Sequence, residues 1–203
     1  MIAIYGSPKS STGRCVWALE EAGVTYELKS VDMRNKEHKS PSFLKLNPNG
    51  KIPVLTDGDF TLYESMAINS YIAESYKKDL LGKAPAEKAL VQQWSYWASL
   101  ELQNPIIEVF IQKVFVPEDK RDQNVIAKNL EKLPSLFSIL DGALKDKKYL
   151  VGNQFSLADL NVASVASIAT AIGFETKTFQ NFTSWMANLA ERPAFKKYME
   201  LRK

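Results

Sequence analysis

The chain has 203 residues, a formal net charge of +3 and 24% charged residues. A charge this small and this evenly spread argues against a basic surface for nucleic acid or membranes. With 45% apolar residues the chain can bury a sizeable core. No run of about 18 apolar residues predicts a membrane span, and no basic-then-apolar N-terminus predicts a signal peptide. A single cysteine fits a reducing compartment, so we expect a cytoplasmic protein.

The first 78 residues mix the periods of strands and helices. In chain order the predicted elements are a strand at 2–5, a helix at 12–22, a strand at 25–32, a hairpin at 53–63 and a helix at 65–76. Gly23 is placed to end the first helix, Asp57-Gly58 predicts the hairpin turn, and Ser65 can cap the last helix. This order predicts an α/β domain with a mixed four-stranded sheet.

Beyond residue 86 only helical patterns are convincing. The predicted helical segments are 87–115, 124–146, 156–173 and one from about 181. Pro105, Pro134 and Pro193 interrupt or bend three of them. Ser156 and Asp159 form a capping box before a segment that is apolar all round and therefore buried. We expect an α/β domain at 1–78, a linker at 79–85 and an all-helical domain at 86–203.

Three consecutive hydroxyl residues, Ser10, Ser11 and Thr12, stand in the stretch YGSPKSSTGR between the first strand and the first helix. They can cap the helix, whose first amides lack backbone partners. Alternatively, they can hold a reactive group of a ligand. Cys15, just inside the helix, fits a small buried hydrophobic residue.

The stretch NPNGKIPVL places Pro53 at the start of a strand, where its missing amide donor is tolerated. If the Ile52–Pro53 bond is cis, the backbone of Ile52 turns outward and can pair with an extended ligand peptide. The alternative is an ordinary tight loop before a hairpin.

Two further polar pairs can bind charged groups. Glu64 and Ser65 open a helix, whose free amides attract an anion. Ser65 can bind a carboxylate and Glu64 an ammonium, or the pair is a plain helix cap. His38 and Lys39 can receive a second carboxylate, or they lie in an exposed loop. Because His38 is the only histidine and Cys15 the only cysteine, we expect no metal centre.

These stretches, in this order and together with FSLADL, resemble the soluble glutathione transferase family over nearly the whole chain. The EHKSP region is most like the phi class, and the spacing from Ser10 to Arg14 is like the delta and theta classes. The resemblance implies a thioredoxin-like domain followed by a helical-bundle domain. It also implies a homodimer formed through the helix from Ser65 to Tyr76 and the helix from Glu87.

The activity implied by the resemblance is conjugation of reduced glutathione, as co-substrate, to small apolar electrophiles in detoxification. The alternatives are a non-catalytic binding module of the same fold, or a glutathione-dependent peroxidase or isomerase using the same site.

The resemblance also implies roles for matching residues. Ser10 would donate a hydrogen bond to the thiolate and Arg14 would support it. Ser11 is the alternative, because the loop departs from the phi pattern by about one residue. The other implied glutathione-binding residues are His38, Lys39, Lys51, Ile52, Pro53, Glu64 and Ser65. The implied electrophile-site candidates are Asn104, Ile107, Ile111 and Phe115, with core packing as the alternative for the apolar ones.

Overall fold

The computed structural model describes residues 1–202, so Lys203 of the predicted helical domain lies outside the described residues. Backbone contacts divide the chain into two compact units. The first unit is Met1–Leu81 with the segment that begins at Glu191, and the second is Gly82–Ala190. The predicted domain division remains a prediction. The compact units differ from it because the last helix of the chain groups with the N-terminal unit.

The first unit contains a four-stranded sheet. Its strands are β1 (Ile2–Tyr5), β2 (Tyr26–Lys29), β3 (Val54–Asp57) and β4 (Phe60–Tyr63). Their order is β2-β1-β3-β4, with β1 parallel to β2 and the other pairs antiparallel. The predicted mixed sheet is therefore confirmed. Asp57 pairs with Phe60, so the hairpin turn lies at Gly58-Asp59, one residue later than predicted.

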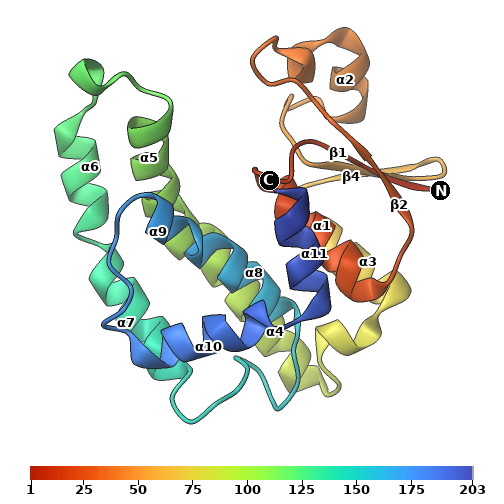
Figure 1. Ribbon diagram of the computed structural model, residues 1–203. Helices are drawn as coiled ribbons and strands as arrows, with labels where there is room; N and C mark the ends of the chain where they lie inside the picture. Colours follow the sequence, from red (N-terminus) through yellow and green to blue (C-terminus); the bar gives the residue numbers. More distant parts are fainter. Residues whose placement is uncertain (203) are drawn as a thin grey trace. The chain divides into compact units, whose positions relative to one another are not determined.

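Helices cover both faces of this sheet. The helices of the unit are α1 (Thr12–Ala22), α2 (Pro41–Leu46), α3 (Ser65–Tyr76) and α11 (Pro193–Leu201). In Figure 1, α1 and α3 lie on one face and α2 lies on the other. Gly23 ends α1 in the left-handed conformation, with φ of 67°, as predicted.

The short helix α2 was not predicted, although its start carries a sequence signal. Ser40 Oγ accepts a hydrogen bond from the Phe43 amide, and Pro41 occupies the first turn. Phe43 is buried with Val31 and Val54. A fully buried side chain of this size contributes about 1.5–3 kcal/mol, and this contact fixes the connection before β3 on the sheet.

The second unit is helical. Its helices are α4 (Pro85–Trp97), α5 (Gln103–Val114), α6 (Gln123–Leu130), α7 (Leu133–Ala143), α8 (Leu157–Ala166), α9 (Ile168–Ala171) and α10 (Gln180–Ala190). The predicted interruption near Pro105 is a π-helical turn at Ala98–Leu102. Every residue of α8 is buried, as predicted. None of the described helices has the length and apolar character needed to cross a membrane.

Asp159 is the polar centre of the second unit. Its carboxylate accepts hydrogen bonds from the amide of Leu150 at 2.8 Å, the amide of Ser156 at 3.0 Å and Trp185 Nε1 at 2.9 Å. The capping box with Ser156 is confirmed. Burial raises the pKa of Asp159, and these hydrogen bonds oppose the rise. The carboxylate thus ties the start of α8 to α10 and to the preceding loop.

Candidate active site

The loop between β1 and α1, residues 6–11, is here called the hydroxyl loop. Ser10 is its exposed hydroxyl residue. Ser10 Oγ lies 2.7 Å from the carbonyl oxygen of Ser7 and 3.0 Å from Thr12 Oγ1, and it accepts from the Thr12 amide at 3.2 Å. A hydroxyl has one proton and rotates freely. Ser10 can therefore redirect its donor to a ligand while it keeps the amide of Thr12.

Of the three candidate hydroxyls it is Ser10 that caps α1, and the expected capping role of Ser65 is wrong. Ser11 occupies the position before α1, but its side chain makes no capping hydrogen bond. The first amide of the helix is instead bonded by Ser10. Likewise Ser65 is the first residue of α3, and Glu64 takes the position before it, again without a side-chain cap. Glu64 has φ of 70°, a conformation that is uncommon outside glycine and frequent at functional sites.

The structure brings the starts of α1 and α3 together. The buried Arg14 donates from Nη1 to Ser65 Oγ at 3.3 Å, and Cys15 Sγ lies 3.5 Å from the carbonyl oxygen of Ser65. Burial lowers the pKa of Arg14, while Cys15 and Tyr198 act in the opposite direction. Arg14, the predicted supporting residue of the thiol site, thus contacts the predicted carboxylate-binding residue Ser65.

Ile52 belongs to the same region. The Ile52–Pro53 bond is cis, the first of the two possibilities considered from the sequence. Gly6 faces it: a Cβ at Gly6 would collide with Thr12 Oγ1 and lie 3.2 Å from Ile52 Cβ. The segment before β3 therefore borders the hydroxyl loop, and only glycine fits between them.

His38 and Lys39 form a second group with the loop before Ile52. Lys39 Nζ donates to the carbonyl oxygens of Asn49 at 3.2 Å and Gly50 at 2.9 Å. The ammonium group therefore supports this loop. His38 Nδ1 is buried without a hydrogen-bond partner among the described residues, whereas Lys51 is exposed.

Asn47 carried no predicted role in this region, whereas Thr12 was one of the three candidate hydroxyls. Asn47 is 2% exposed. Its amide donates to the carbonyl oxygen of Lys51 at 2.7 Å, and its Oδ1 accepts from the Asn49 amide at 3.0 Å. Thr12 is fully buried and meets Ser10. The Asn-Pro-Asn-Gly sequence is a turn signal that could have indicated the role of Asn47.

The four electrophile-site candidates lie on α5 and just after it in the second unit. Ile107 is partly buried, Ile111 is 40% exposed and Phe115 is 72% exposed. Asn104 is exposed and donates to the carbonyl oxygen of Leu100 at 2.9 Å. Ile111 and Phe115 are too exposed within the described residues to serve as core. They remain predictions as electrophile contacts.

Cys15 is predicted to be chemically inert in the folded protein. It is fully buried, and burial raises its pKa to about 12 against the opposing charge of Arg14. Only on the order of 10⁻⁵ of the thiol would be ionised at neutral pH. A thiol reagent should therefore label native protein negligibly within an hour and label denatured protein completely. Rapid stoichiometric labelling of native protein would contradict the buried placement.

A thioredoxin-like sheet with a cis proline before its third strand, joined to an all-helical unit, defines a two-domain class of glutathione-binding proteins. Two family models match the chain: "Glutathione S-transferase, N-terminal domain" at residues 2–74 and "Glutathione S-transferase, C-terminal domain" at residues 102–193. The chain belongs to the glutathione S-transferase family.

Similar proteins support this assignment over the full length. Glutathione S-transferase 1 of Zea mays is 38% identical, and the match covers 98% of this chain and 96% of that protein. The crystal structure of glutathione transferase F7 from Populus trichocarpa has a TM-score of 0.91 at 34% identity and covers 100% of both chains. A structure of glutathione S-transferase I from mais, in complex with an atrazine glutathione conjugate, has a TM-score of 0.89 at 35% identity and covers 99% of this chain and 97% of that chain.

Proposed function

We propose that the protein conjugates the thiolate of reduced glutathione to small apolar electrophiles, with Ser10 as the donor to the thiolate. One observation carries the proposal. The exposed hydroxyl of Ser10 precedes α1, and Arg14, in the first turn of α1, donates to the hydroxyl of Ser65 at the start of α3. The relatives are named as transferases, which does not favour the alternatives of a binding module, a peroxidase or an isomerase.

The hydroxyl loop suits a thiolate for a physical reason. A free thiol has a pKa of about 8.5 and attacks only as the thiolate. A hydrogen bond to a charged group contributes roughly 1.5–3 kcal/mol, which lowers the pKa by about one to two units. Ser10 supplies such a bond when its proton turns from Ser7 toward the sulfur. The start of α1 adds a favourable dipole, and the buried charge of Arg14 supports the same helix turn.

The charged ends of glutathione have matching partners in this proposal. The γ-glutamyl carboxylate meets Ser65 and the amides that begin α3, and the ammonium meets Glu64. The cysteinyl backbone pairs with Ile52, ahead of Pro53. The glycine carboxylate meets the group formed by His38, Lys39 and Lys51. Because Lys39 already supports the loop at Asn49-Gly50, the exposed Lys51 is the more available cation, and His38 is half-buried.

The electrophile is proposed to lie against α5. A relative is bound to an atrazine glutathione conjugate, which is the kind of product that the proposed reaction gives. Here Ile107, Ile111 and Phe115 offer apolar contacts, and Asn104 offers a polar one.

Turnover with glutathione and a panel of aromatic halides, epoxides and peroxides tests the function. If the pure protein neither binds glutathione nor turns over any panel member, the proposal is wrong.

Binding is expected to depend on Ser65. Ser65→Ala removes a hydroxyl that contacts Arg14 and, in the proposal, the γ-glutamyl carboxylate. Glutathione affinity should fall by roughly 10–100-fold, since each such bond contributes about 1.5–3 kcal/mol. Calorimetry measures this. Ser70→Ala is the matched control, because Ser70 lies on the same helix and its hydroxyl donates to the carbonyl oxygen of Met66. Equal affinities for the two variants would contradict the assignment of Ser65.

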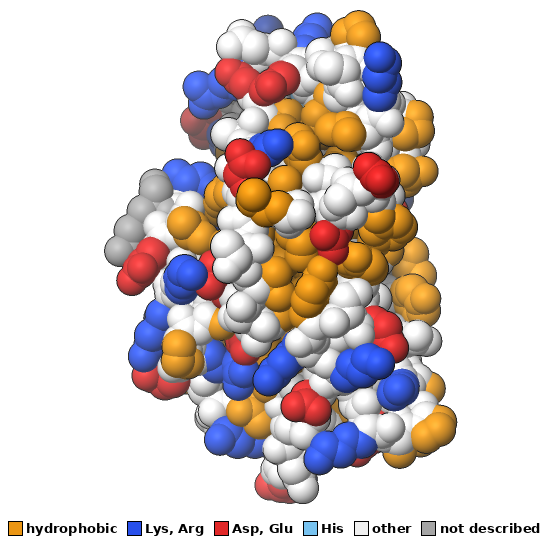
Figure 2. Space-filling view, turned by 90° about the vertical axis from the view of Figure 1, so that its right-hand side faces the viewer, with side chains coloured by type: hydrophobic (Ala, Val, Ile, Leu, Met, Phe, Trp, Pro, Cys, Tyr) orange, Lys and Arg blue, Asp and Glu red, His pale blue; other side chains and the backbone are white. Residues whose placement is uncertain are grey.

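We also propose a cytoplasmic homodimer. Exposed apolar side chains on and next to α3 include Phe60 and Tyr76, and those on and next to α4 include Leu90, Tyr96 and Leu100. Figure 2 shows hydrophobic side chains gathered on the face that it presents. Light scattering at micromolar concentration should give twice the 22.9 kDa chain mass. A mass equal to one chain would refute the dimer.

A further inference from the structure

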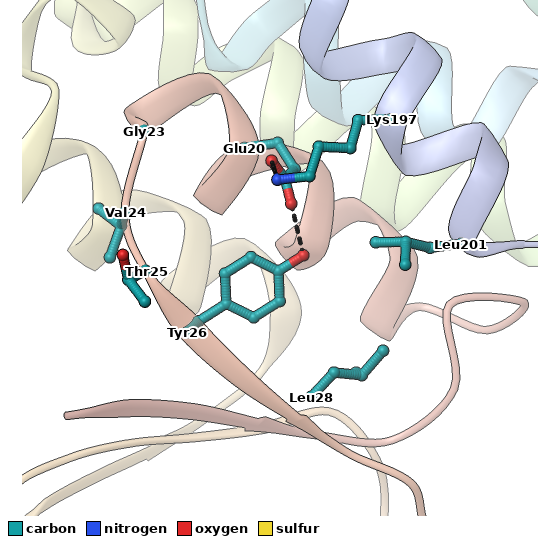
Figure 3. Close-up of a pocket in the computed structure, with 8 residues that line it drawn as sticks. All are labelled: Glu20, Gly23, Val24, Thr25, Tyr26, Leu28, Lys197 and Leu201. Atoms are coloured by element: carbon teal, nitrogen blue, oxygen red, sulfur yellow. Dashed lines mark hydrogen bonds and ion pairs between the residues drawn. The ribbon is translucent and has the colours of Figure 1, made fainter.

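The last helix of the chain, α11, is fixed on α1 by charged and aromatic contacts within the first unit. Arg192 makes a bidentate pair with Glu21, at 2.7 and 2.6 Å. Lys197 pairs with Glu20 at 2.7 Å, and Glu20 also accepts from Tyr26 at 2.7 Å (Figure 3). Both glutamate side chains are at most 8% exposed. A bidentate pair such as Arg192–Glu21 is both strong and directional, so it fixes the start of α11 against α1.

Tyr198 is the buried side chain of α11, with 4% exposure. Its ring stacks on Trp17 with centroids 5.9 Å apart and planes 3° apart. The ring of Phe195 packs on the same indole edge to face, with centroids 4.9 Å apart. The C-terminal helix therefore presents two aromatic rings to α1, and each meets Trp17 in a different orientation.

Tyr198 also reaches the first turn of α1. A Cβ at Gly13 would lie 2.9 Å from Tyr198 Cε2 and 3.1 Å from its hydroxyl oxygen, and it would collide with the carbonyl oxygen of Pro8. Gly13 thus lies between the hydroxyl loop and the tyrosine ring with no room for a side chain. The amide of Gly13 in turn donates to the carbonyl oxygen of Ser10 at 2.9 Å. The ring bounds the turn that carries Ser10.

The phenol oxygen also faces positive charge. It accepts from Arg202 Nη1 at 2.9 Å. Burial raises the pKa of Tyr198, and the charges of Arg202 and Arg14 oppose this rise. Arg14 is the guanidinium that donates to Ser65. Tyr198 therefore lies beside Gly13, in the first turn of α1, and interacts with the charge that links this turn to α3.

We propose that Tyr198 is a positioning residue for the glutathione reaction, which holds the first turn of α1 through Gly13 so that the Ser10 hydroxyl meets the thiolate. This inference rests on the proposed function. Small displacements of a donor are costly, because roughly 1 Å of misplacement can reduce a rate by up to about 100-fold. Tyr198 touches no reacting atom in this account and acts through the backbone of the turn.

The test compares Tyr198→Leu, Tyr198→Phe and Phe195→Leu by the pH dependence of kcat/KM for conjugation. Tyr198→Leu removes the ring beside Gly13. We expect kcat/KM to fall roughly 10-fold at neutral pH, and the acidic limb of the pH profile to move to higher pH. Tyr198→Phe keeps the ring and should stay within about threefold of the wild type. Phe195→Leu is the matched control, because it weakens the packing on Trp17, whereas the atoms nearest to a Cβ at Gly13 belong to Pro8 and Tyr198. It should keep the wild-type pH profile.

Two results overturn the inference. Either Tyr198→Leu and Phe195→Leu lose activity equally with unchanged pH profiles, or Tyr198→Leu behaves like the wild type. Tyr198→Met, whose unbranched and flexible side chain adapts better to an irregular space, replaces Tyr198→Leu if that variant does not fold, with the same expected shift. The wild type is measured first. Its failure to turn over glutathione would refute the proposed function, whereas a normal wild type with unshifted variants refutes only the role of Tyr198.

Discussion

Ser10→Ala is expected to lower turnover at neutral pH by roughly 10–100-fold, because a donor to the thiolate contributes about 1.5–3 kcal/mol. The pKa of the bound thiol should rise by about one to two units. Its thiolate fraction then falls most at low pH and recovers as pH rises through the new pKa. The loss should therefore be large near pH 6.5 and small above pH 9, measured as kcat across this range with saturating glutathione.

Ser11→Ala is the matched control for Ser10→Ala. Ser11 lies next in the chain, and its side chain makes no capping bond. It should leave both kcat and stability close to those of the wild type, with a change in stability within about 0.5 kcal/mol. Ser10→Ala also loses the acceptor for the Thr12 amide, a cap that contributes about 0.5–2 kcal/mol. If Ser11→Ala shifts the profile and Ser10→Ala does not, the assignment is wrong by one residue.

Asp159→Ala is expected to lower the free energy of unfolding by about 3–5 kcal/mol. The variant leaves the amides of Leu150 and Ser156 and the indole of Trp185 without their common acceptor in a buried place, and each unsatisfied group costs about 1–3 kcal/mol. Relaxation and water entry reduce the sum. Urea unfolding of the purified protein measures the effect through the midpoint and slope.

Asp119→Ala controls for the loss of one negative charge in the same unit. Asp119 is exposed, and its replacement should change the free energy of unfolding by less than about 0.5 kcal/mol. A similar midpoint for the two variants would show that the carboxylate of Asp159 contributes no more than an exposed charge.

Local patterns predicted most of the fold, since each of its signals lies within a few residues. Gly23 ends α1 and Ser156 with Asp159 begins α8, as predicted. The start of α1 was harder, because three neighbouring hydroxyls are equivalent by sequence. The backbone decides among them: Ser11 already has helical dihedral angles, so the capping oxygen comes from Ser10, one residue earlier.

The long-range contacts of the candidate site could not be predicted from local sequence patterns. The link from Arg14 to Ser65 joins residues 51 positions apart. The approach of Tyr198 to Gly13 joins opposite ends of the chain. Such pairs have no periodicity or spacing that identifies them, since they depend on how α1, α3 and α11 pack. The grouping of α11 with the N-terminal unit escaped prediction for the same reason.

The most direct test of thiol activation is the ultraviolet absorbance of the thiolate of glutathione bound to the wild-type protein, titrated against pH. The account predicts a midpoint about one to two units below that of a free thiol, whose pKa is about 8.5. Ser11→Ala should keep this midpoint, and Ser10→Ala should return it toward the free value. A wild-type midpoint equal to that of free glutathione, with binding demonstrated in the same sample, would contradict activation of the thiol by this site.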